Sequence, residues 1–363
     1  GMNKFVINKN FWKNKKILIT GHNGFKGTWL TLTLKILGAK VYGYSLKSPT
    51  NPNLFDLLKL KKKIEKSYFG DVRDKEKLKK VLNIVRPNIV FHLAAQPLVL
   101  DSYKNPYETF EINFLGTLNV LELTRNIKCI KSTIIVTTDK VYKTSNKKNT
   151  YEEKDELGVT DPYGSSKVTA EMVSETYIKL LYNKGKFLKA ATVRAGNVLG
   201  GGDFSKNRLI PDLIRSLEKK SKFIIRNPEH IRPWQFVMEP LHGYMILAEK
   251  IYKNKINKKD YCWNFAPNIE NCITVKNFIN IFSNNLEKKI IIKFFNNKIN
   301  KNRKETKILK LKINKSKKIL NWKPKYKVNK IIDLIKEWYF LGYMKNNHEK
   351  IISNQIKEFL FKK

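Results

Sequence analysis

Residues 15–27 read KKILITGHNGFKG, and this stretch decides the fold. Its first six residues have the apolar, β-branched character of a buried strand, and that strand runs directly into a turn with glycine at Gly21, Gly24 and Gly27. An apolar helix is expected next, over 28–37. Glycine at this spacing lets the backbone approach a pyrophosphate, and the N-terminus of the following helix favours negative charge. The stretch therefore predicts a dinucleotide-binding unit.

The alternation of strand and helix continues up to residue 195. Further strands are expected at 40–45, 88–93, 132–137 and 190–194, with helices over 107–126 and 165–183 between them. Strands that alternate with helices form βαβ units, which build a parallel sheet with helices on both faces. The expected fold class is therefore α/β, a Rossmann-type doubly wound parallel sheet with a smaller C-terminal α/β region that binds substrate.

Beyond residue 195 the pattern becomes irregular. Helices are expected near 210–220, 241–252 and 331–343, and the last of these is amphipathic and expected only to pack. We interpret residues 1–195 as the dinucleotide-binding domain. Residues 196–363 are interpreted as a substrate-binding region that packs partly back on that domain.

Composition excludes several classes of protein. Hydrophobic residues make up 42% and aromatic residues 12% of the chain, which is enough for a globular core. No stretch approaches the roughly 18 apolar residues that a membrane span needs, and the N-terminus lacks an apolar signal core, so a soluble cytoplasmic protein with no membrane partner is expected. The three cysteines are widely spaced and the histidines scattered, so neither a disulfide nor a metal site is expected.

The net charge of +41 raises the question of nucleic acid. About half of the excess lies in the last 113 residues, which hold 28 basic and 8 acidic side chains. Lysine is scattered there among asparagine and isoleucine, without the interleaved aromatic side chains that would stack bases. This distribution indicates a biased composition rather than a nucleic-acid surface, although the field would attract anionic nucleotide substrates.

The residue expected to bind the adenosine ribose lies at the end of the second strand. An acid is typical there in NAD enzymes, but this sequence has Ser45, and Lys47 follows. A lysine could accommodate a 2′-phosphate, so NADP stays open beside NAD. Asp71, after a third strand, is a candidate acceptor for the adenine amine, and a helix cap or turn is the structural alternative.

Tyr163 and Lys167 form a Y-x-x-x-K pair, which places both side chains on one face of a helix. A lysine ammonium stabilises a tyrosinate and lowers the tyrosine pKa, so that the tyrosine can take a hydroxyl proton while hydride leaves the same carbon. The pair follows a strand that ends in Thr138, Asp139 and Lys140. This combination, downstream of a glycine turn, predicts an oxidoreductase site.

Together, the glycine turn, Leu93-Ala94-Ala95, Asn113 ahead of Gly116-Thr117, and the Y-x-x-x-K pair resemble the extended short-chain dehydrogenase/reductase family. The resemblance implies NAD as cofactor and a nucleotide-linked sugar as substrate, in a homodimer or homotetramer. It also implies a set of cofactor contacts: Gly21, Asn23, Gly24, Phe25, Gly27, Ser45, Asp71, Val72, Leu93, Ala94, Ala95, Asn113, Tyr163 and Lys167.

Within this family the chain resembles the 4,6-dehydratases that act on CDP-glucose. The stretches that carry this resemblance are 21–27, 92–99, 194–203, 208–212, 225–228 and 232–235, within a similar region over about 11–267. Residues 141–160 do not look familiar, and Gly164 stands where serine is expected, which puts the sugar preference in doubt more than the reaction. The resemblance implies deoxysugar synthesis for a surface polysaccharide.

The pair Asp139-Lys140 separates the dehydratases from one another. In this sequence the pair is similar to the Asp-Lys pair of the CDP-glucose enzymes, whereas the dehydratases that act on dTDP- and GDP-sugars carry a pair that resembles Asp-Glu. The implied mechanism has Tyr163 deprotonate the 4-hydroxyl, held by Thr138, during oxidation of C4. Lys140 then removes the C5 proton, Asp139 protonates the departing 6-hydroxyl, and hydride returns to C6. A turn cap and a solvated lysine are the structural alternatives, and a 4-epimerase or another nucleotide sugar the functional ones.

A nucleoside diphosphate needs cationic donors, and arginine supplies the bidentate geometry that suits phosphate. Arg208 and Arg232 are the candidates, with Asn197 as a neutral donor, and surface ion pairs are the structural alternative. Gln96 and Ser102 complete the expected substrate contacts.

Overall fold

The computed structural model describes residues 7–144, 150–182, 185–225, 227–284, 286, 291–294 and 309–362. Its centre is a sheet of seven strands in the order β12-β7-β5-β4-β1-β2-β3, in which all neighbouring strands run parallel. The strands are β1 (Lys16–Thr20), β2 (Lys40–Ser45), β3 (Lys66–Phe69), β4 (Ile89–His92), β5 (Ser132–Val136), β7 (Ala190–Ala195) and β12 (Cys262–Phe265). The predicted doubly wound parallel sheet is confirmed.

The strands at the middle of the sheet are covered on both faces. Ile17, Leu18 and Ile19 of β1 are fully buried, as are Ile134 and Ile135 of β5. Near-continuous runs of aliphatic residues are typical of parallel strands because helices cover both sides of such a sheet. The order of the strands reverses between β1 and β4, since β2 and β3 lie on one side of β1 and the later strands on the other. In open α/β sheets the crevice at this switch point is where ligands bind.

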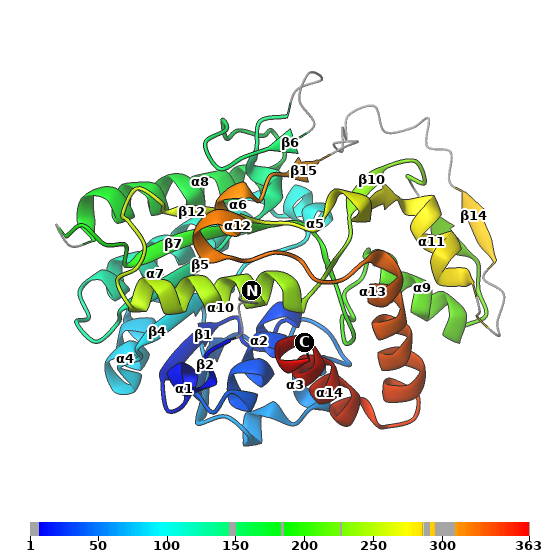
Figure 1. The fold of residues 1–363 in the computed structure, drawn as a ribbon, viewed down its shortest axis with the longest axis horizontal. Helices are drawn as coiled ribbons and strands as arrows, with labels where there is room; N and C mark the ends of the chain where they lie inside the picture. The colour runs from blue at the N-terminus through cyan, green and yellow to red at the C-terminus, as the bar shows by residue number, and fades with distance from the viewer. Residues whose placement is uncertain are drawn as a thin grey trace, which may run out of the picture.

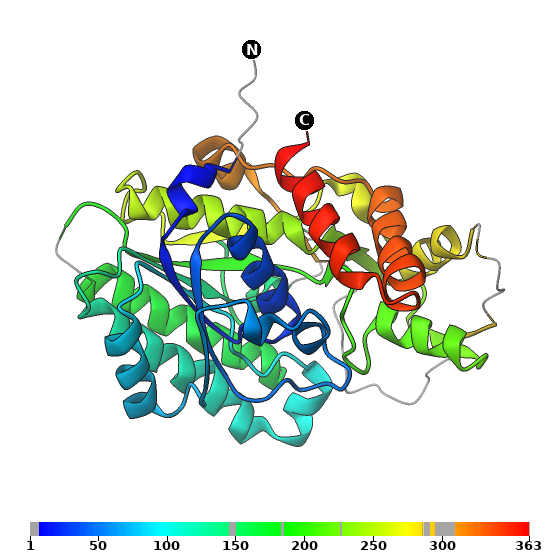
Figure 2. The same ribbon diagram turned by 90° about the horizontal axis from the view of Figure 1, so that it is seen from below.

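Helices form a layer on each face of the sheet (Figures 1 and 2). α4 (Lys75–Val85), α7 (Gly116–Arg125) and α8 (Pro162–Thr176) lie on one face. α2 (Phe25–Ile36) and α10 (Met238–Tyr252) lie on the other. α8 is preceded by two short helices that pack against it, α5 (Val99–Lys104) and α6 (Pro106–Phe110).

Several helix boundaries differ from the sequence expectation, and those of α2 and α8 bear on the site. α2 begins at Phe25, three residues early, because Gly24 serves as its N-cap. α8 begins at Pro162, where Asp161 caps it by accepting a hydrogen bond from the Gly164 amide at 2.8 Å. α8 continues as a π-turn over Tyr177–Leu181, and residue 183, the expected end, lies outside the described residues.

The segment after β7 is less regular and contains small paired strands. These are β8 (Val198–Leu199) with β11 (Gln235–Phe236), β10 (Ile231–Pro233) with β13 (Cys272–Thr274), and β9 (Phe223–Ile225) with β14 (Ile292–Phe294). α9 (Leu209–Glu218) and α11 (Val275–Ser283) flank them. β12 belongs to the same segment, yet it pairs with β7 at the edge of the main sheet. The division at residue 195 stays a prediction.

The C-terminus forms a helical hairpin of α13 (Val328–Lys336), a π-turn over Glu337–Tyr343, and α14 (His348–Phe361). It packs on the loop after β8, where the Trp338 ring lies over Gly201 and the Tyr339 hydroxyl donates to the Asp203 carbonyl at 2.8 Å. The expected amphipathic helix is thus present, and α14 follows it unpredicted. None of the helices in the described part of the chain combines the length and apolar character that crossing a bilayer requires.

The contact between Trp338 and Gly201 gives a test of the hairpin packing. A Cβ atom on Gly201 would overlap the Trp338 ring, so Gly201→Ala should lower the free energy of unfolding by about 1–3 kcal/mol in urea denaturation. Gly185→Ala is the matched control because a Cβ there meets no atom within 4 Å. Equal stabilities of the two variants would show that the hairpin does not pack on this loop.

Candidate active site

The glycine turn brings β1 against the end of β4. Gly21 has a positive φ of 71°, and a Cβ on it would lie 2.6 Å from the Ala94 amide nitrogen. A Cβ on Gly27 would overlap the Gly21 carbonyl oxygen. These two glycines are therefore required by the fold itself, because the turn, the first turn of α2 and the loop at Leu93-Ala94 touch through their backbones.

Gly24 differs from its two neighbours in the motif. Its φ is −73°, which any residue adopts, and a Cβ on it would meet only the Gly21 oxygen, at 3.4 Å. The α2 N-terminus that follows has no side-chain cap and no acid in its first turn, so its amides keep their capacity for an anion. An open approach to uncapped helix amides fits a dinucleotide pyrophosphate.

The hydroxyl at the end of β2 is held by a histidine. Ser45 Oγ lies 3.1 Å from His22 Nδ1, and His22 Nε2 lies 2.8 Å from Ser67 Oγ. Burial lowers the pKa of His22 to about 4, so the ring is neutral. Asn23 donates to the Leu46 carbonyl at 2.7 Å, which fixes the turn beside this hydroxyl. With no acid at Ser45, these contacts do not by themselves separate NAD from NADP.

Asp71 has a partner that the sequence interpretation did not foresee. Arg73 donates to both of its carboxylate oxygens, with Nη2 2.7 Å from Oδ2, and Arg73 Nη1 also pairs with Glu111 at 3.1 Å. Burial acts to raise the pKa of Asp71, but hydrogen bonds from Arg73 outweigh it and hold the pKa below its ordinary value. The neighbouring Val72 is buried and leaves no room for a Cβ at Gly116. The adenine contact stays a prediction.

Tyr163 and Lys167 lie on the inner face of α8, 8% and 4% exposed. Burial raises the pKa of Tyr163 to about 12, against the lowering effects of a hydrogen bond with Thr138 and of the Arg208 charge. Burial and the nearby charge of Lys26 lower the pKa of Lys167 to about 8. The tyrosine pKa is thus not lowered as the sequence had led us to expect, because desolvation of the phenolate dominates.

Asn113 joins this helix to the loop after β4. It lies in a π-turn over Glu111–Leu115, a distortion that is frequent at functional sites. Its Nδ2 donates to Ser166 Oγ at 2.9 Å, and its Oδ1 accepts from the Gln96 amide at 2.9 Å. Asn113 therefore fixes the position of α8 relative to residues 93–96.

Gln96 and Ser102 have partners inside the protein. The Gln96 amide group donates to the Leu98 carbonyl at 3.1 Å and accepts from the Leu98 amide at 2.5 Å. Ser102 is fully buried and donates to the Val99 carbonyl at 2.7 Å. Both side chains thus shape the loop, and their roles as substrate contacts stay predictions.

Asp139 and Lys140 begin a short 3-10 helix, Asp139–Val141, at the end of β5. Thr138 is its N-cap and also donates to Asp139 Oδ1 at 3.2 Å. Asp139 is 4% exposed and packs so closely on the end of β7 that a Cβ on Gly196 would lie 2.7 Å from Oδ2. Asp139 is therefore both a turn residue and a buried carboxylate beside Tyr163, whose pKa its charge raises.

Gly164, the departure from the expected serine, has a local steric reason. A Cβ there would lie 2.5 Å from Val159 Cγ2, 2.8 Å from Asp161 Oδ2 and 3.1 Å from the Lys140 carbonyl oxygen. Val159 and Asp161, which precede α8, thus occupy the space that the side chain of the expected serine would need.

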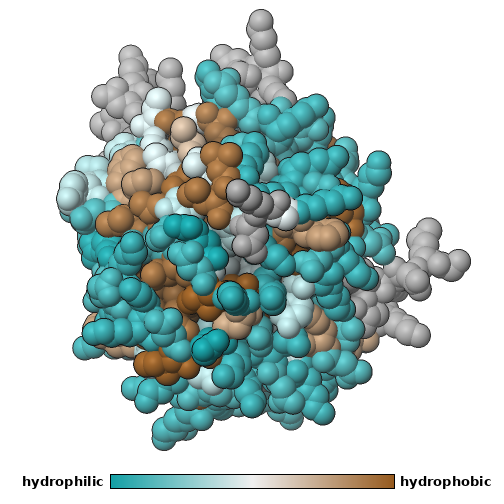
Figure 3. Space-filling view, turned by 90° about the vertical axis from the view of Figure 1, so that its left-hand side faces the viewer, coloured by the Kyte–Doolittle hydropathy of each residue, from teal (hydrophilic) through white to brown (hydrophobic). Residues whose placement is uncertain are grey.

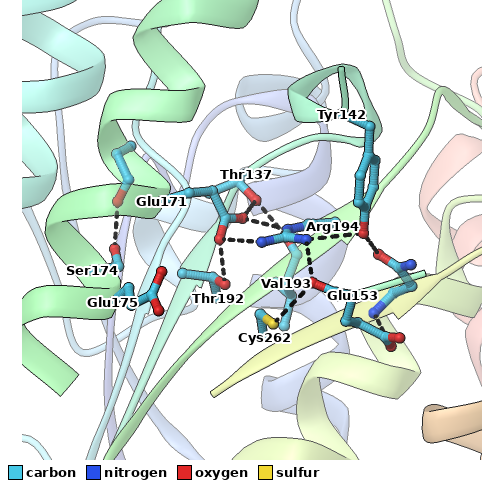
Figure 4. A network of polar contacts seen from close by, with 12 residues as sticks. Thr137, Tyr142, Glu153, Glu171, Ser174, Glu175, Thr192, Val193, Arg194 and Cys262 are labelled. Atoms are coloured by element: carbon cyan, nitrogen blue, oxygen red, sulfur yellow. Dashed lines mark hydrogen bonds and ion pairs between the residues drawn. The ribbon is translucent and has the colours of Figure 1, made fainter. Parts of the chain in front are cut away.

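A buried ion pair links α8 to the sheet, and the sequence interpretation missed it. Figure 4 shows Glu171 of α8 facing Arg194 of β7, with Nη2 2.9 Å from Oε2 and Nε 2.9 Å from Oε1. Thr137 donates to Glu171 at 2.5 Å, and Arg194 Nη1 donates to the Tyr142 hydroxyl at 2.9 Å. Glu171 lies one helical turn after Lys167, so both side chains are on the inner face of α8. This spacing is visible in the sequence and could have predicted the position of the acid.

The other three expected substrate-binding side chains lie in different surroundings. Arg208 caps α9, pairs with the buried Asp203 at 3.2 Å, and is close enough to Tyr163 to lower its pKa. Asn197 is exposed directly after β7. Arg232 lies in β10 with Nη2 2.9 Å from His230 Nδ1. Arg208 is therefore brought to the Tyr163 cluster, whereas Arg232 lies in β10 beside His230.

The buried Glu171–Arg194 ion pair predicts how the stabilities of a single and a double variant should differ. Arg194→Met leaves the Glu171 carboxylate buried without its counter-charge, so the free energy of unfolding should fall by about 3–5 kcal/mol. The double variant Arg194→Met/Glu171→Leu removes both charges and should recover most of that loss in the same urea titration. A double variant as unstable as Arg194→Met alone would rule out charge coupling as the cause.

Comparison with known proteins agrees with this geometry. The family model described as GDP-mannose 4,6 dehydratase matches residues 18–335. CDP-glucose 4,6-dehydratase of Salmonella typhimurium is 45% identical over 275 residues, which cover 75% of this chain and 76% of the relative. dTDP-D-glucose 4,6-dehydratase of Dictyostelium discoideum is 30% identical over 65% of this chain and 56% of its own length.

Solved structures agree on the fold. dTDP-glucose 4,6-dehydratase of Bacillus anthracis, solved in complex with NAD, superposes with a TM-score of 0.72 at 20% identity, covering 90% of this chain and 97% of that one. The UDP-glucose 4-epimerase of Thermotoga maritima, solved with UDP-glucose, gives a TM-score of 0.73 at 22% identity, covering 89% and 98% of the two chains. The chain belongs to the family whose model is described as GDP-mannose 4,6 dehydratase.

Proposed function

We propose that this protein is a CDP-glucose 4,6-dehydratase, which converts CDP-glucose to CDP-4-keto-6-deoxyglucose and water. The observation that carries the proposal is the 45% identity to the Salmonella typhimurium enzyme together with Asp139 and Lys140 beside the Tyr163–Lys167 pair. The product is a deoxysugar precursor of the kind used in surface polysaccharides, and we expect the enzyme to work in the cytoplasm.

The cofactor in this proposal is NAD, held by the glycine turn and the uncapped α2 amides. Gly24 and the amides that follow it would bind the pyrophosphate, and Ser45, Asn23 and the 93–95 loop would line the adenosine and ribose positions. NAD supplies, when bound, a reversible two-electron acceptor and a positive charge. The relative of known structure that binds NAD and has the same reaction type supports this choice.

The first step belongs to α8 and the end of β5. Tyr163 would take the proton of the sugar 4-hydroxyl as C4 is oxidised to a ketone, and Thr138, already hydrogen-bonded with Tyr163, would hold the same hydroxyl. Lys167, as an ammonium, stabilises the tyrosinate by its charge, and Glu171 one turn further along α8 acts to raise the pKa of Lys167 and so keeps it protonated.

The second step is the elimination of water. The 4-keto group acidifies the C5 proton, which Lys140 would remove as the base. Once protonated, Asp139, which is buried at the end of β5 and accepts a hydrogen bond from Thr138, would pass that proton to the departing 6-hydroxyl. The C5–H and C6–O bonds break, a C5–C6 double bond forms, and the hydrogen taken from C4 returns to C6 while C5 is protonated again. The reaction is therefore redox-neutral overall.

The substrate diphosphate would be bound by Arg208, whose guanidinium is 34% exposed and oriented by Asp203. Asn197 and Arg232 complete the expected set. Arginine suits this role because its planar fork binds phosphate oxygens in pairs.

We further propose a homodimer formed along α8. Met172 of α8 is 60% exposed, and Leu180 and Leu181 in the π-turn that extends α8 are 75% and 45% exposed. Tyr107 of α6, a helix that packs on α8, is 77% exposed. Figure 3 shows hydrophobic patches between polar side chains on one side of the molecule. Apolar side chains gathered on adjoining helices are typical of a subunit interface.

The proposed function predicts substrate selectivity. Purified enzyme with NAD should convert CDP-glucose to a product lighter by one water in mass spectrometry, and turn over dTDP-, GDP- and UDP-glucose far more slowly. The product should also show the absorbance of a 4-keto sugar in strong base. A product of unchanged mass would indicate a 4-epimerase, and preference for another nucleotide would overturn the CDP assignment.

The two steps should separate by mutation. Tyr163→Phe removes the C4 base while keeping the pocket filled, so turnover should fall by on the order of 10²–10⁴ without reduction of bound cofactor. Lys140→Met should still oxidise C4, and the near-ultraviolet absorbance of reduced cofactor should therefore accumulate after substrate is added. Solvent deuterium should enter C5 of the wild-type product and be lost or slowed in Lys140→Met. If Lys140→Met shows none of these defects, Lys140 is only a solvated residue.

A further inference from the structure

The loop between β8 and α9, residues 200–208, lies between α2 and the C-terminal hairpin. On one side Trp29 of α2 donates to the Gly201 carbonyl at 3.0 Å. On the other side the Trp338 ring covers the same glycine. The loop ends at Arg208, the N-cap of α9. It therefore connects the helix that follows the glycine turn with the last helices of the chain.

Three successive carbonyls of this loop accept hydrogen bonds from side chains of other elements. The Tyr339 hydroxyl, in the π-turn of the hairpin, donates to the Asp203 carbonyl at 2.8 Å. Arg215 of α9 donates to the next two, with Nη1 3.1 Å from the Phe204 oxygen and Nη2 3.0 Å from the Ser205 oxygen. The backbone of this irregular segment is thus fixed from two sides, because each of these bonds has to break before it can move.

Asp203 connects the fixed backbone to a cation. Its Oδ2 lies 3.2 Å from Arg208 Nη1, and its Oδ1 accepts from the Ser205 amide at 3.0 Å. The side chain of Asp203 is 8% exposed, whereas that of Arg208 is 34% exposed. A guanidinium has five N–H donors in a planar fork, so an arginine held at one nitrogen by a buried carboxylate still has donors to offer a phosphate.

We propose that Tyr339 is a positioning residue for the substrate diphosphate, a role that rests on the function proposed above. The Tyr339 hydroxyl fixes the backbone at Asp203, the Asp203 carboxylate orients Arg208, and Arg208 binds the diphosphate. Tyr339 is 1% exposed, so it acts through the loop and not by contact with the substrate. The C-terminal hairpin thereby contributes to substrate binding although it supplies no group to the reaction.

The role of Tyr339 has a kinetic signature. Removal of the hydroxyl leaves the Asp203 carbonyl without this donor, and the net contribution of such a hydrogen bond corresponds to about a 3–10-fold change in an equilibrium constant. The diphosphate is remote from the carbons that react, so a weaker contact with it destabilises the bound substrate and the transition state alike. The expected result is a higher KM with an unchanged kcat.

The test is steady-state kinetics of the full chain on CDP-glucose with NAD, together with equilibrium binding of CDP. Tyr339→Phe should raise the KM for CDP-glucose and the dissociation constant for CDP by about 3–10-fold, while kcat and the affinity for NAD stay within about twofold of wild type. Tyr343→Phe, in the same π-turn, is the matched control. Tyr343 contacts Phe204 and Trp338 through its ring, which phenylalanine keeps, so this variant should behave as wild type.

A double variant shows whether Tyr339 acts through Arg208. Arg208→Met removes the cation and should raise the KM by about 10–100-fold. Adding Tyr339→Phe to Arg208→Met should then change the KM by less than about twofold, because the group that Tyr339 positions is already gone. If the two effects multiply in full, the tyrosine acts by some route other than Arg208, and the inference is wrong.

The outcomes separate this inference from the function on which it rests. A raised KM in Arg208→Met beside a wild-type KM in Tyr339→Phe would remove the role of Tyr339 alone. A wild-type KM in Arg208→Met would instead contradict the assignment of Arg208 to the diphosphate.

Two further measurements keep the inference testable. If wild-type enzyme does not turn over CDP-glucose, the proposed function fails, and the dissociation constants of CDP, UDP, GDP and dTDP for the same variants still decide the role of Tyr339. If Tyr339→Phe does not fold, Asp203→Asn takes its place. That variant keeps the loop backbone and removes the counter-charge of Arg208, so it should raise the KM with kcat unchanged, and a wild-type KM would show that Asp203 does not orient Arg208 for the substrate.

Discussion

The ion pair between Glu171 and Arg194 is the interaction on which the site depends. Two charges taken out of water destabilise a protein unless each polar atom finds a partner. Here both carboxylate oxygens accept from Arg194, and two threonine hydroxyls supply the remaining donors, Thr137 directly after β5 at 2.5 Å and Thr192 of β7 at 2.8 Å. Thr137 directly precedes Thr138, so the pair fixes the end of β5 against the helix that carries Tyr163.

The second constraint is the close approach of backbones at the carboxyl edge of the sheet. Gly21 touches the loop after β4, Gly27 touches the turn after β1, and Gly196 leaves space for Asp139. Parallel strands end at the same edge, so residues from four strands meet there although they are far apart in sequence. Gly24 is the exception in this set because no protein atom demands it, and its open side marks where a ligand can approach the α2 amides.

The sequence predicted the sheet well because its strands carry strong local signals, and it predicted the Tyr163–Lys167 helix because the spacing is regular. β12 escaped prediction because Cys262–Phe265 is short and takes its place only through pairing with β7. The Asp71–Arg73 pair and the internal partners of Gln96 and Ser102 depend on side-chain rotamers that no spacing reveals.

The order of the Tyr163 and Lys167 pKa values explains why positive charge is useful in this site. Burial raises the pKa of Tyr163 to about 12 and lowers that of Lys167 to about 8, so in the isolated protein the lysine loses its proton before the tyrosine does. A tyrosinate forms more readily as positive charge accumulates around it, and Arg208 already lowers the Tyr163 pKa. On the proposed function the nicotinamide ring adds another positive charge, which favours tyrosinate formation during the oxidation of C4. On the proposed function, positive charge around Tyr163 would therefore favour the tyrosinate that accepts the sugar proton.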